Sequence, residues 1–114
     1  MSVYRGAVKK GEGRGKALGF PTANIPLRDA SIRGIFAARA WAMGKEYSAA
    51  VYADQRRKLL EAYLLNFSGE LYGEMAEVEV VKKIRDIRKF ASLEELKAQI
   101  VEDVKQVRQL LEIQ

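Results

Sequence analysis

Hydrophobic and polar residues alternate with a period of two in the run 75–84, where Glu77 and Glu79 alternate with apolar residues. This alternation is typical of a half-buried β-strand. Other short β-prone runs cover residues 1–9, 35–41, 46–52 and 59–67. The pattern therefore predicts five or six short strands.

Short glycine-containing connections indicate how these runs pair. Met43-Gly44-Lys45 joins two of them at hairpin spacing, and Ser68-Gly69-Glu70 stands between the runs 59–67 and 75–84. We therefore expect two hairpins, one around each connection. Gly6, inside the first run, indicates a bend or a β-bulge.

The period changes after residue 91. Ser92 with Glu95 three residues later has the spacing of a capping box, and apolar residues then recur every three or four positions. These residues are Leu93, Leu96, Ile100, Val104, Val107 and Leu110. Because the charged residues fall away from this stripe, we predict a helix over 92–111 that lies on the strands with the stripe in the core.

The order of elements indicates a fold class. Several short strands followed by one helix predict a mainly β fold, a small six-stranded antiparallel Greek-key barrel with a C-terminal helix packed on it. The length of 114 residues fits one core, since domains usually contain about 100–150 residues. We expect a single domain over residues 1–114, and a monomer.

The composition excludes several classes of site. With no cysteine and no histidine, the chain has no disulfide, no thiolate zinc site and no histidine base, so acid–base chemistry falls to carboxylates, lysine or tyrosine. No apolar run approaches the roughly 20 residues of a membrane span, and the N-terminus lacks a signal-peptide core. We expect a cytoplasmic protein without a membrane partner. The net charge of +5 suits an anionic partner but does not choose one.

The most distinctive stretch covers residues 11–24 and reads GEGRGKALGFPTAN. Glycines allow consecutive backbone N–H groups to turn toward an anion, and Arg14 or Lys16 could then offset phosphate charge. The stretch lacks the GK[ST] of a Walker A loop. An isolated glycine-rich loop is more often a flexible connection than a phosphate site.

The end of this stretch offers candidate metal ligands. Pro21 restrains the backbone just before Thr22 and Asn24, and side chains two residues apart in an extended segment point the same way. Such neutral oxygens suit Mg²⁺, which takes further ligands from water and substrate phosphates. They could equally satisfy backbone groups in a turn, and the residues alone leave both interpretations open.

The string over 11–24 resembles the signature of the riboflavin kinase family, a GxGRGxxLGxPTAN-like segment. GIFA at 34–37 is similar to the strand that follows in that family. LEAYLLNFSGELYGE at 60–74 resembles the strand with the family's catalytic glutamate, and IRDIRKFASLEELKAQIVEDV at 84–104 resembles its C-terminal end. The resemblance spans nearly the whole chain.

The resemblance implies an activity and assigns residues to it. The activity is transfer of the γ-phosphate of ATP to the 5′-hydroxyl of riboflavin, which makes FMN and ADP and uses Mg²⁺ or another divalent cation. Glu61 corresponds to the catalytic base, Thr22 and Asn24 to the metal ligands, and Arg85 to an arginine near the flavin. The implied nucleotide-binding residues are Gly11, Gly13, Arg14, Gly15, Lys16, Pro21 and Thr22.

The chain departs from the family pattern just before Glu61. Family members usually have a longer segment with a glycine-arginine-proline element, whereas residues 48–60 read SAAVYADQRRKLL. Tyr63 and Asn66 stand where the family usually has histidine and aspartate. These departures favour a second interpretation, a member that binds flavin or nucleotide without turnover.

Two further expectations concern partners. A nucleic-acid-binding small barrel would use the positive charge and stacking aromatic residues, but a folded barrel normally buries such residues, so we expect no nucleic-acid partner. The chain as given lacks the adenylyltransferase domain that precedes this module in bifunctional bacterial enzymes. We therefore expect it to make FMN and not FAD.

Overall fold

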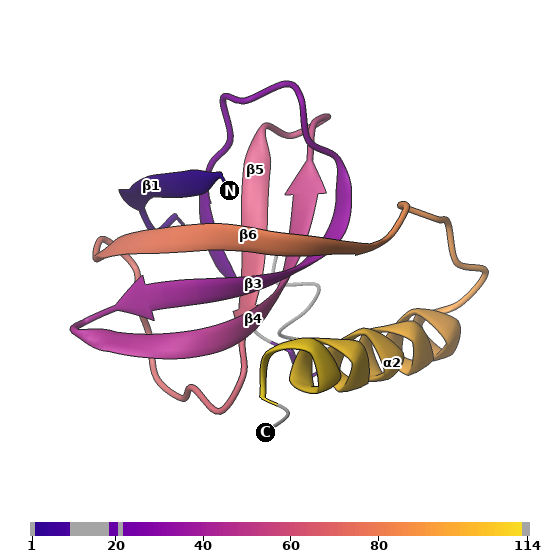
Figure 1. Cartoon of the computed structure of the whole chain (residues 1–114). Coiled ribbons are helices and arrows are strands. Elements are labelled where there is room, and N and C mark those ends of the chain that lie inside the picture. Colours follow the sequence, from indigo (N-terminus) through magenta and orange to yellow (C-terminus); the bar gives the residue numbers. More distant parts are fainter. Residues whose placement is uncertain (1, 10–18, 21, 113–114) are drawn as a thin grey trace.

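A computed structural model of the chain describes residues 2–9, 19–20 and 22–112. This part of the chain forms six strands and one helix, whose arrangement can be followed in Figure 1. The elements are β1 Val3–Ala7, β2 Ala23–Pro26, β3 Gly34–Ala42, β4 Lys45–Asp54, β5 Leu59–Leu64, β6 Met75–Arg85 and α2 Leu93–Leu111. The predicted mainly β fold with a C-terminal helix is confirmed. β2 is the strand that the hydrophobic pattern did not locate.

The six strands form one antiparallel sheet in the order β1-β6-β3-β4-β5-β2. Strands β3, β4 and β5 are successive neighbours and β6 returns beside β3, which is the Greek-key arrangement. The chain just beyond β1 meets β2 where the Lys9 N–H donates to the Asn24 carbonyl at 2.6 Å. The sheet is therefore a nearly closed barrel, with β6 and β3 crossing in front of β5 in Figure 1.

One of the two predicted hairpins is confirmed. Met43 and Gly44 form the turn between β3 and β4, with φ angles of 50° and 77°, and Ala42 pairs with Lys45. The other predicted hairpin, between the runs 59–67 and 75–84, is wrong. β5 pairs with β4 and β2, whereas β6 pairs with β1 and β3.

The connection between β5 and β6 crosses one end of the barrel instead of turning back. It includes Leu65 and Leu71, both buried. The Val8 N–H donates to the Glu74 carbonyl at 2.9 Å, and the Gly73 N–H donates to the Val8 carbonyl at 3.0 Å. These bonds tie the end of the connection to the chain just beyond β1, so β6 starts beside β1 and not beside β5.

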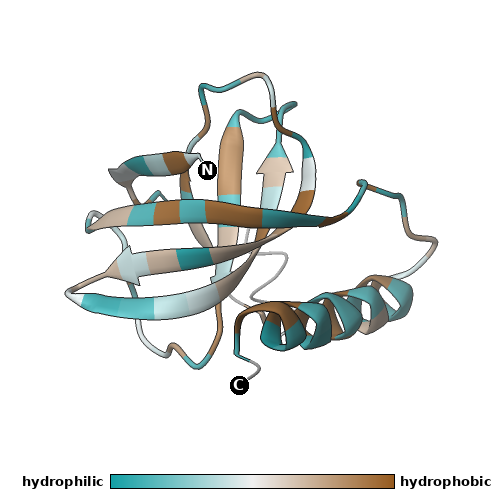
Figure 2. Ribbon diagram, in the orientation of Figure 1, coloured by the Kyte–Doolittle hydropathy of each residue, from teal (hydrophilic) through white to brown (hydrophobic). Residues whose placement is uncertain are grey.

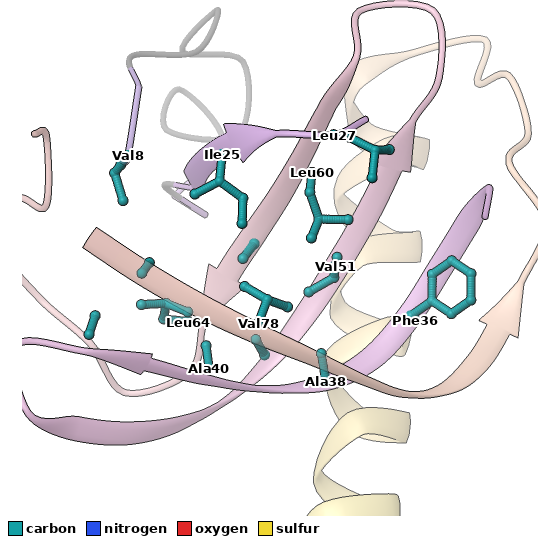
Figure 3. Packing of buried hydrophobic residues seen from close by; sticks show 14 of the residues in the cluster. Val8, Ile25, Leu27, Phe36, Ala38, Ala40, Val51, Leu60, Leu64 and Val78 are labelled. Atoms are coloured by element: carbon teal, nitrogen blue, oxygen red, sulfur yellow. The ribbon is translucent and has the colours of Figure 1, made fainter. Parts of the chain in front are cut away.

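The inner face of the barrel forms the main core. Hydrophilic and hydrophobic residues alternate along β6 in Figure 2, so one face of the strand can be apolar. Alanines such as Ala38 and Ala40 occupy the inner positions of β3, while Ile25 and Leu60 fill the space from β2 and β5. Figure 3 shows these side chains converging between the strands.

Helix α2 starts where the sequence predicts. The Ser92 Oγ accepts a hydrogen bond from the Glu95 N–H at 3.2 Å. The Glu95 carboxylate accepts from the Ala91 N–H at 3.0 Å, one residue before the partner of a standard capping box. No helix in the described part of the chain is long and apolar enough to cross a membrane.

The buried face of α2 only partly matches the predicted stripe. Val107 is fully buried, whereas Leu93 is 55% and Leu110 is 43% exposed. The helix packs on the outer side of the barrel mainly through its C-terminal half, so residues near the helix start lie beyond the strands. A second hydrophobic cluster forms there from Ala37, Leu65 and Val107, joined by Ala50, Tyr63, Ile84, Val104 and Leu111.

Strand β6 is irregular opposite β3. The register shifts between Ile35 and Phe36 and again between Ala37 and Ala38, which bends β6 around the barrel. Of the bend or bulge predicted at Gly6, the bulge is wrong. Gly6 pairs in regular register, and a Cβ there would lie 3.0 Å from the Pro26 Cδ, so glycine instead permits the close approach of β1 to β2.

We expect Gly34→Ala to destabilise the barrel. Gly34 has a φ of 115°, and a Cβ there would lie 2.8 Å from the Arg85 carbonyl oxygen. Backbone strain and overpacking together should lower the free energy of unfolding by about 2–4 kcal/mol, as measured by urea denaturation. Gly44→Ala is the matched control, because Gly44 has a φ of 77° with no atom within 4 Å; its loss should be about 1 kcal/mol. Equal losses would show that the contact with Arg85 is unimportant.

Candidate functional site

Three of the sequence-predicted site residues lie in one row on the outer face of the barrel. Asn24 on β2 is opposite Glu61 on β5, and Glu61 is opposite Tyr52 on β4. The row continues through Ile35 to Arg85 on β6. Directly opposed residues of an antiparallel sheet share a face, with Cβ atoms about 4.5–5.5 Å apart. The register therefore brings Asn24 and Glu61 together and places Arg85 at the far end of the row.

Asn24 is a buried polar residue with an unsatisfied oxygen. It is 1% exposed, and among the described residues its Oδ1 is the only buried side-chain oxygen or nitrogen without a hydrogen-bond partner. Leaving such an atom unpaired costs about 1–3 kcal/mol, so an unpaired buried oxygen in a native structure usually has a structural or functional explanation. An amide oxygen is a suitable ligand for Mg²⁺, and the residue therefore fits a divalent cation.

The other predicted metal ligand, Thr22, lies just before β2 and is half-buried. It lines a cavity of about 140 Å³ at one end of the barrel, together with Val8 of the first run and the connection after β5. No group of three or more acidic side chains in the described residues could hold a metal by itself. The neutral oxygens of Thr22 and Asn24 thus stay the candidates.

The predicted phosphate loop is described only at its end. Gly11, Gly13, Arg14, Gly15, Lys16 and Pro21 lie outside the described residues. Phe20 is described, and its ring contacts Tyr63 edge-to-face with the centroids 5.2 Å apart. Tyr63 follows Glu61 by two residues on β5 and so shares its face. This contact places Phe20 on the strand of Glu61.

Arg57 in the turn between β4 and β5 holds the Glu61 carboxylate. Its Nη2 donates to Glu61 Oε2, and its Nε donates to Asp54 Oδ2 at 2.7 Å. The side chains of Asp54, Arg57 and Glu61 are 4%, 20% and 16% exposed. Burial acts to raise the pKa of Asp54, but the hydrogen bonds from Arg57 outweigh it and hold that pKa below its ordinary value. One guanidinium therefore lies between two largely buried carboxylates.

Tyr52 is the titratable neighbour of Glu61 across β4. Its burial, and then the negative charges of Asp54 and Glu61, raise the pKa of the Tyr52 phenol. A phenol with a raised pKa stays protonated at neutral pH and is a poor proton acceptor. Within this row, Glu61 is the better candidate for a base.

Arg85 is paired with helix α2. Its Nε and Nη2 donate to the two carboxylate oxygens of Asp103, each at 2.8 Å. Asp103 is 3% exposed and also accepts from Gln99 Nε2 at 3.0 Å. The guanidinium carbon lies 5.9 Å from the centre of the Phe90 ring. This two-pronged ion pair fixes the end of β6 to the helix.

The family profile Flavokinase, described as riboflavin kinase, matches residues 2–111. The chain belongs to the riboflavin kinase family.

Several relatives of this riboflavin kinase family member are similar over most of the chain. The bifunctional riboflavin kinase/FMN adenylyltransferase of Escherichia coli K12 is 39% identical over 107 residues, which is 86% of this chain and 34% of the relative. The chain thus spans about a third of the length of that curated relative. The crystal structure of riboflavin kinase from Trypanosoma brucei superposes with a TM-score of 0.73 at 26% identity, covering 96% of this chain and 76% of that one.

One relative bears on the predicted partners. The RNA-binding riboflavin kinase RibR of Bacillus subtilis is 33% identical over 122 residues, which is 99% of this chain and 53% of the relative. The RNA binding in this name is a property of that longer protein. For this riboflavin kinase family member, the absence of a nucleic-acid partner stays a prediction.

Two residues of this riboflavin kinase family member contact predicted site residues but were not themselves predicted from the sequence. Arg57 binds Glu61, although charged residues in a QRRK turn are usually solvated. Asp103 binds Arg85 from the buried face of α2, where periodicity predicts only apolar residues. The position of Asp103 could have been predicted, because it is next to Val104 and four residues before Val107. This spacing puts it on the packed side of the helix.

Proposed function

We propose that the chain is an ATP-dependent riboflavin kinase that transfers the γ-phosphate of ATP to the 5′-hydroxyl of riboflavin, forming FMN and ADP. The supporting observation is the pairing of Asn24 with Glu61 across β2 and β5. It puts an unsatisfied amide oxygen that suits a cation next to a carboxylate that suits a base. Phosphoryl transfer needs mainly positioning and charge neutralisation, so a cation ligand beside a base can support this reaction.

In the proposed reaction, Glu61 accepts the proton of the riboflavin 5′-hydroxyl while that oxygen forms a bond to the γ-phosphorus. The bond from that phosphorus to the β–γ bridging oxygen breaks, and ADP leaves. Thr22 and Asn24 would hold Mg²⁺, which when bound neutralises charge on the phosphate oxygens. Arg14, Lys16 and the neighbouring glycines are the proposed contacts to those phosphates.

The proposal is tested by product analysis. The protein is incubated with riboflavin, Mg²⁺ and ATP, and riboflavin, FMN and FAD are separated by chromatography. FMN that depends on both ATP and Mg²⁺ is the expected product. Binding of flavin and nucleotide without FMN would instead favour a non-catalytic member, with the short segment before Glu61 as the cause.

We expect Asn24→Ala to weaken metal-dependent nucleotide binding. The dissociation constant for ADP with Mg²⁺ should rise by about 10–100-fold, because water replaces the lost amide oxygen only partly. Isothermal titration with Mg²⁺ or with EDTA provides the control, since binding without metal should not change. The melting temperature should be retained, because the variant removes an unsatisfied buried oxygen. Parental Mg-ADP affinity would disprove the metal assignment.

A further inference from the structure

The turn between β4 and β5 is short and firmly attached to its surroundings. The Gln55 Nε2 donates to the Asp29 carbonyl at 2.8 Å and also to the Ile32 carbonyl. The Leu27 N–H donates to the Lys58 carbonyl at 2.9 Å. All three bonds reach the segment between β2 and β3, which lies beside this turn at one end of the barrel (Figure 1). The turn therefore provides a fixed base for side chains that project from it.

Arg57 is fixed within this turn by Asp54. The buried Asp54 carboxylate accepts the Arg57 backbone N–H at 3.1 Å and the Arg57 Nε at 2.7 Å. These two bonds set both the backbone and the plane of the guanidinium. Nη2 then points to the Glu61 carboxylate. Arginine suits this task because its planar fork can bind two carboxylates in set directions, which a lysine cannot do.

We infer that Arg57 is a positioning residue, which holds the Glu61 carboxylate beside Asn24 in the direction that the reaction needs. A glutamate has three rotatable side-chain bonds, and a base that leaves its productive geometry acts slowly. The inference rests on the proposed function of Glu61. It assigns Arg57 an effect on turnover through Glu61, with no contact to riboflavin or nucleotide.

The first test is Arg57→Gln, with Arg56→Gln as the matched control. Arg56 is the adjacent arginine of the same turn and is exposed. Arg57→Gln should lower kcat for FMN formation by about 10–100-fold, the usual effect of a misplaced reacting group, while the KM for riboflavin and the Kd for Mg-ADP stay unchanged. Arg56→Gln should have parental values. A change confined to KM would overturn the inference, because Arg57 would then bind substrate.

A second variant separates positioning from folding. Arg57→Gln alone leaves the buried Asp54 charge without its partner, which can destabilise the protein. The double variant Asp54→Asn with Arg57→Gln removes both charges and should recover most of the parental melting temperature. In that variant kcat should stay low. Recovery of kcat together with the melting temperature would show that Arg57 is only a structural ion-pair partner.

A double-mutant cycle with Glu61→Gln completes the test. If Arg57 acts through Glu61, adding Arg57→Gln to Glu61→Gln should change kcat by less than about 2-fold, since the two residues form one unit. If the fold-changes in kcat of the two single variants multiplied in the double variant, the inference would be overturned and the proposed function would stay intact. Parental kcat in Glu61→Gln alone would instead overturn both Glu61 as the base and the role of Arg57.

Discussion

Glu61→Gln is expected to lower kcat for FMN formation by about 10²–10⁴-fold, which is the usual contribution of a positioned general base. Glutamine keeps the size and hydrogen-bonding reach of the side chain but cannot accept a proton at neutral pH. The KM for riboflavin should change little, because Glu61 acts as the proton leaves and not in binding. Steady-state kinetics with chromatographic separation of FMN provides the measurement.

The matched control is Glu77→Gln, a glutamate on the outer face of a strand away from the row. Its carboxylate pairs with Arg5 at 3.7 Å and is 46% exposed, and surface pairs of this kind contribute little. Parental kcat is expected for this control. If Glu61→Gln also kept parental kcat, Glu61 would be an ordinary strand carboxylate, and the base would have to be sought among Glu70, Glu74 and Asp86.

Arg85→Ala is expected to lower the free energy of unfolding by about 3–5 kcal/mol, because it leaves the buried Asp103 carboxylate without its ionic partner. The side chains of Arg85 and Asp103 are 18% and 4% exposed, so water replaces the lost guanidinium poorly. Urea denaturation measures the loss. A variant as stable as the parent would mean that the ion pair between β6 and α2 contributes little.

A double variant distinguishes this structural role from the role near the flavin that the family resemblance implies. Arg85→Met with Asp103→Leu replaces the ion pair by apolar side chains, which is often neutral or stabilising. Binding of riboflavin to this double variant can then be measured by fluorescence titration. Weak binding in this stable variant would support a contact between Arg85 and the flavin. Parental binding would limit Arg85 to holding the helix.

The sequence by itself determines the features that depend on neighbours along the chain. The period of two marks the apolar face of β6, Gly44 permits the positive φ of a tight hairpin, and Ser92 accepts the N–H that starts a helix. Through their resemblance to the riboflavin kinase family, the string over 11–24 and the glutamate in the run 59–67 predict a phosphoryl-transfer site. These signals are local, so they can be recognised before the fold is known.

Only the tertiary structure decides which strands are neighbours. Alternation shows which side of β6 is apolar, but it holds equally for every possible partner strand. It therefore could not show that β6 pairs with β1 and β3 instead of with β5. The register that places Asn24 opposite Glu61 comes from pairing between residues far apart in the sequence.

The same reason hides the two ion pairs. Nothing along the chain shows that Arg85 of β6 meets Asp103 of α2, because that contact exists only once the helix lies on the barrel. Arg57 is only four residues from Glu61, yet the residues around it would be the same whether its side chain were solvated or held against Glu61. What separates the two cases is the burial of Asp54 in the folded barrel, because its carboxylate holds the guanidinium that also binds Glu61.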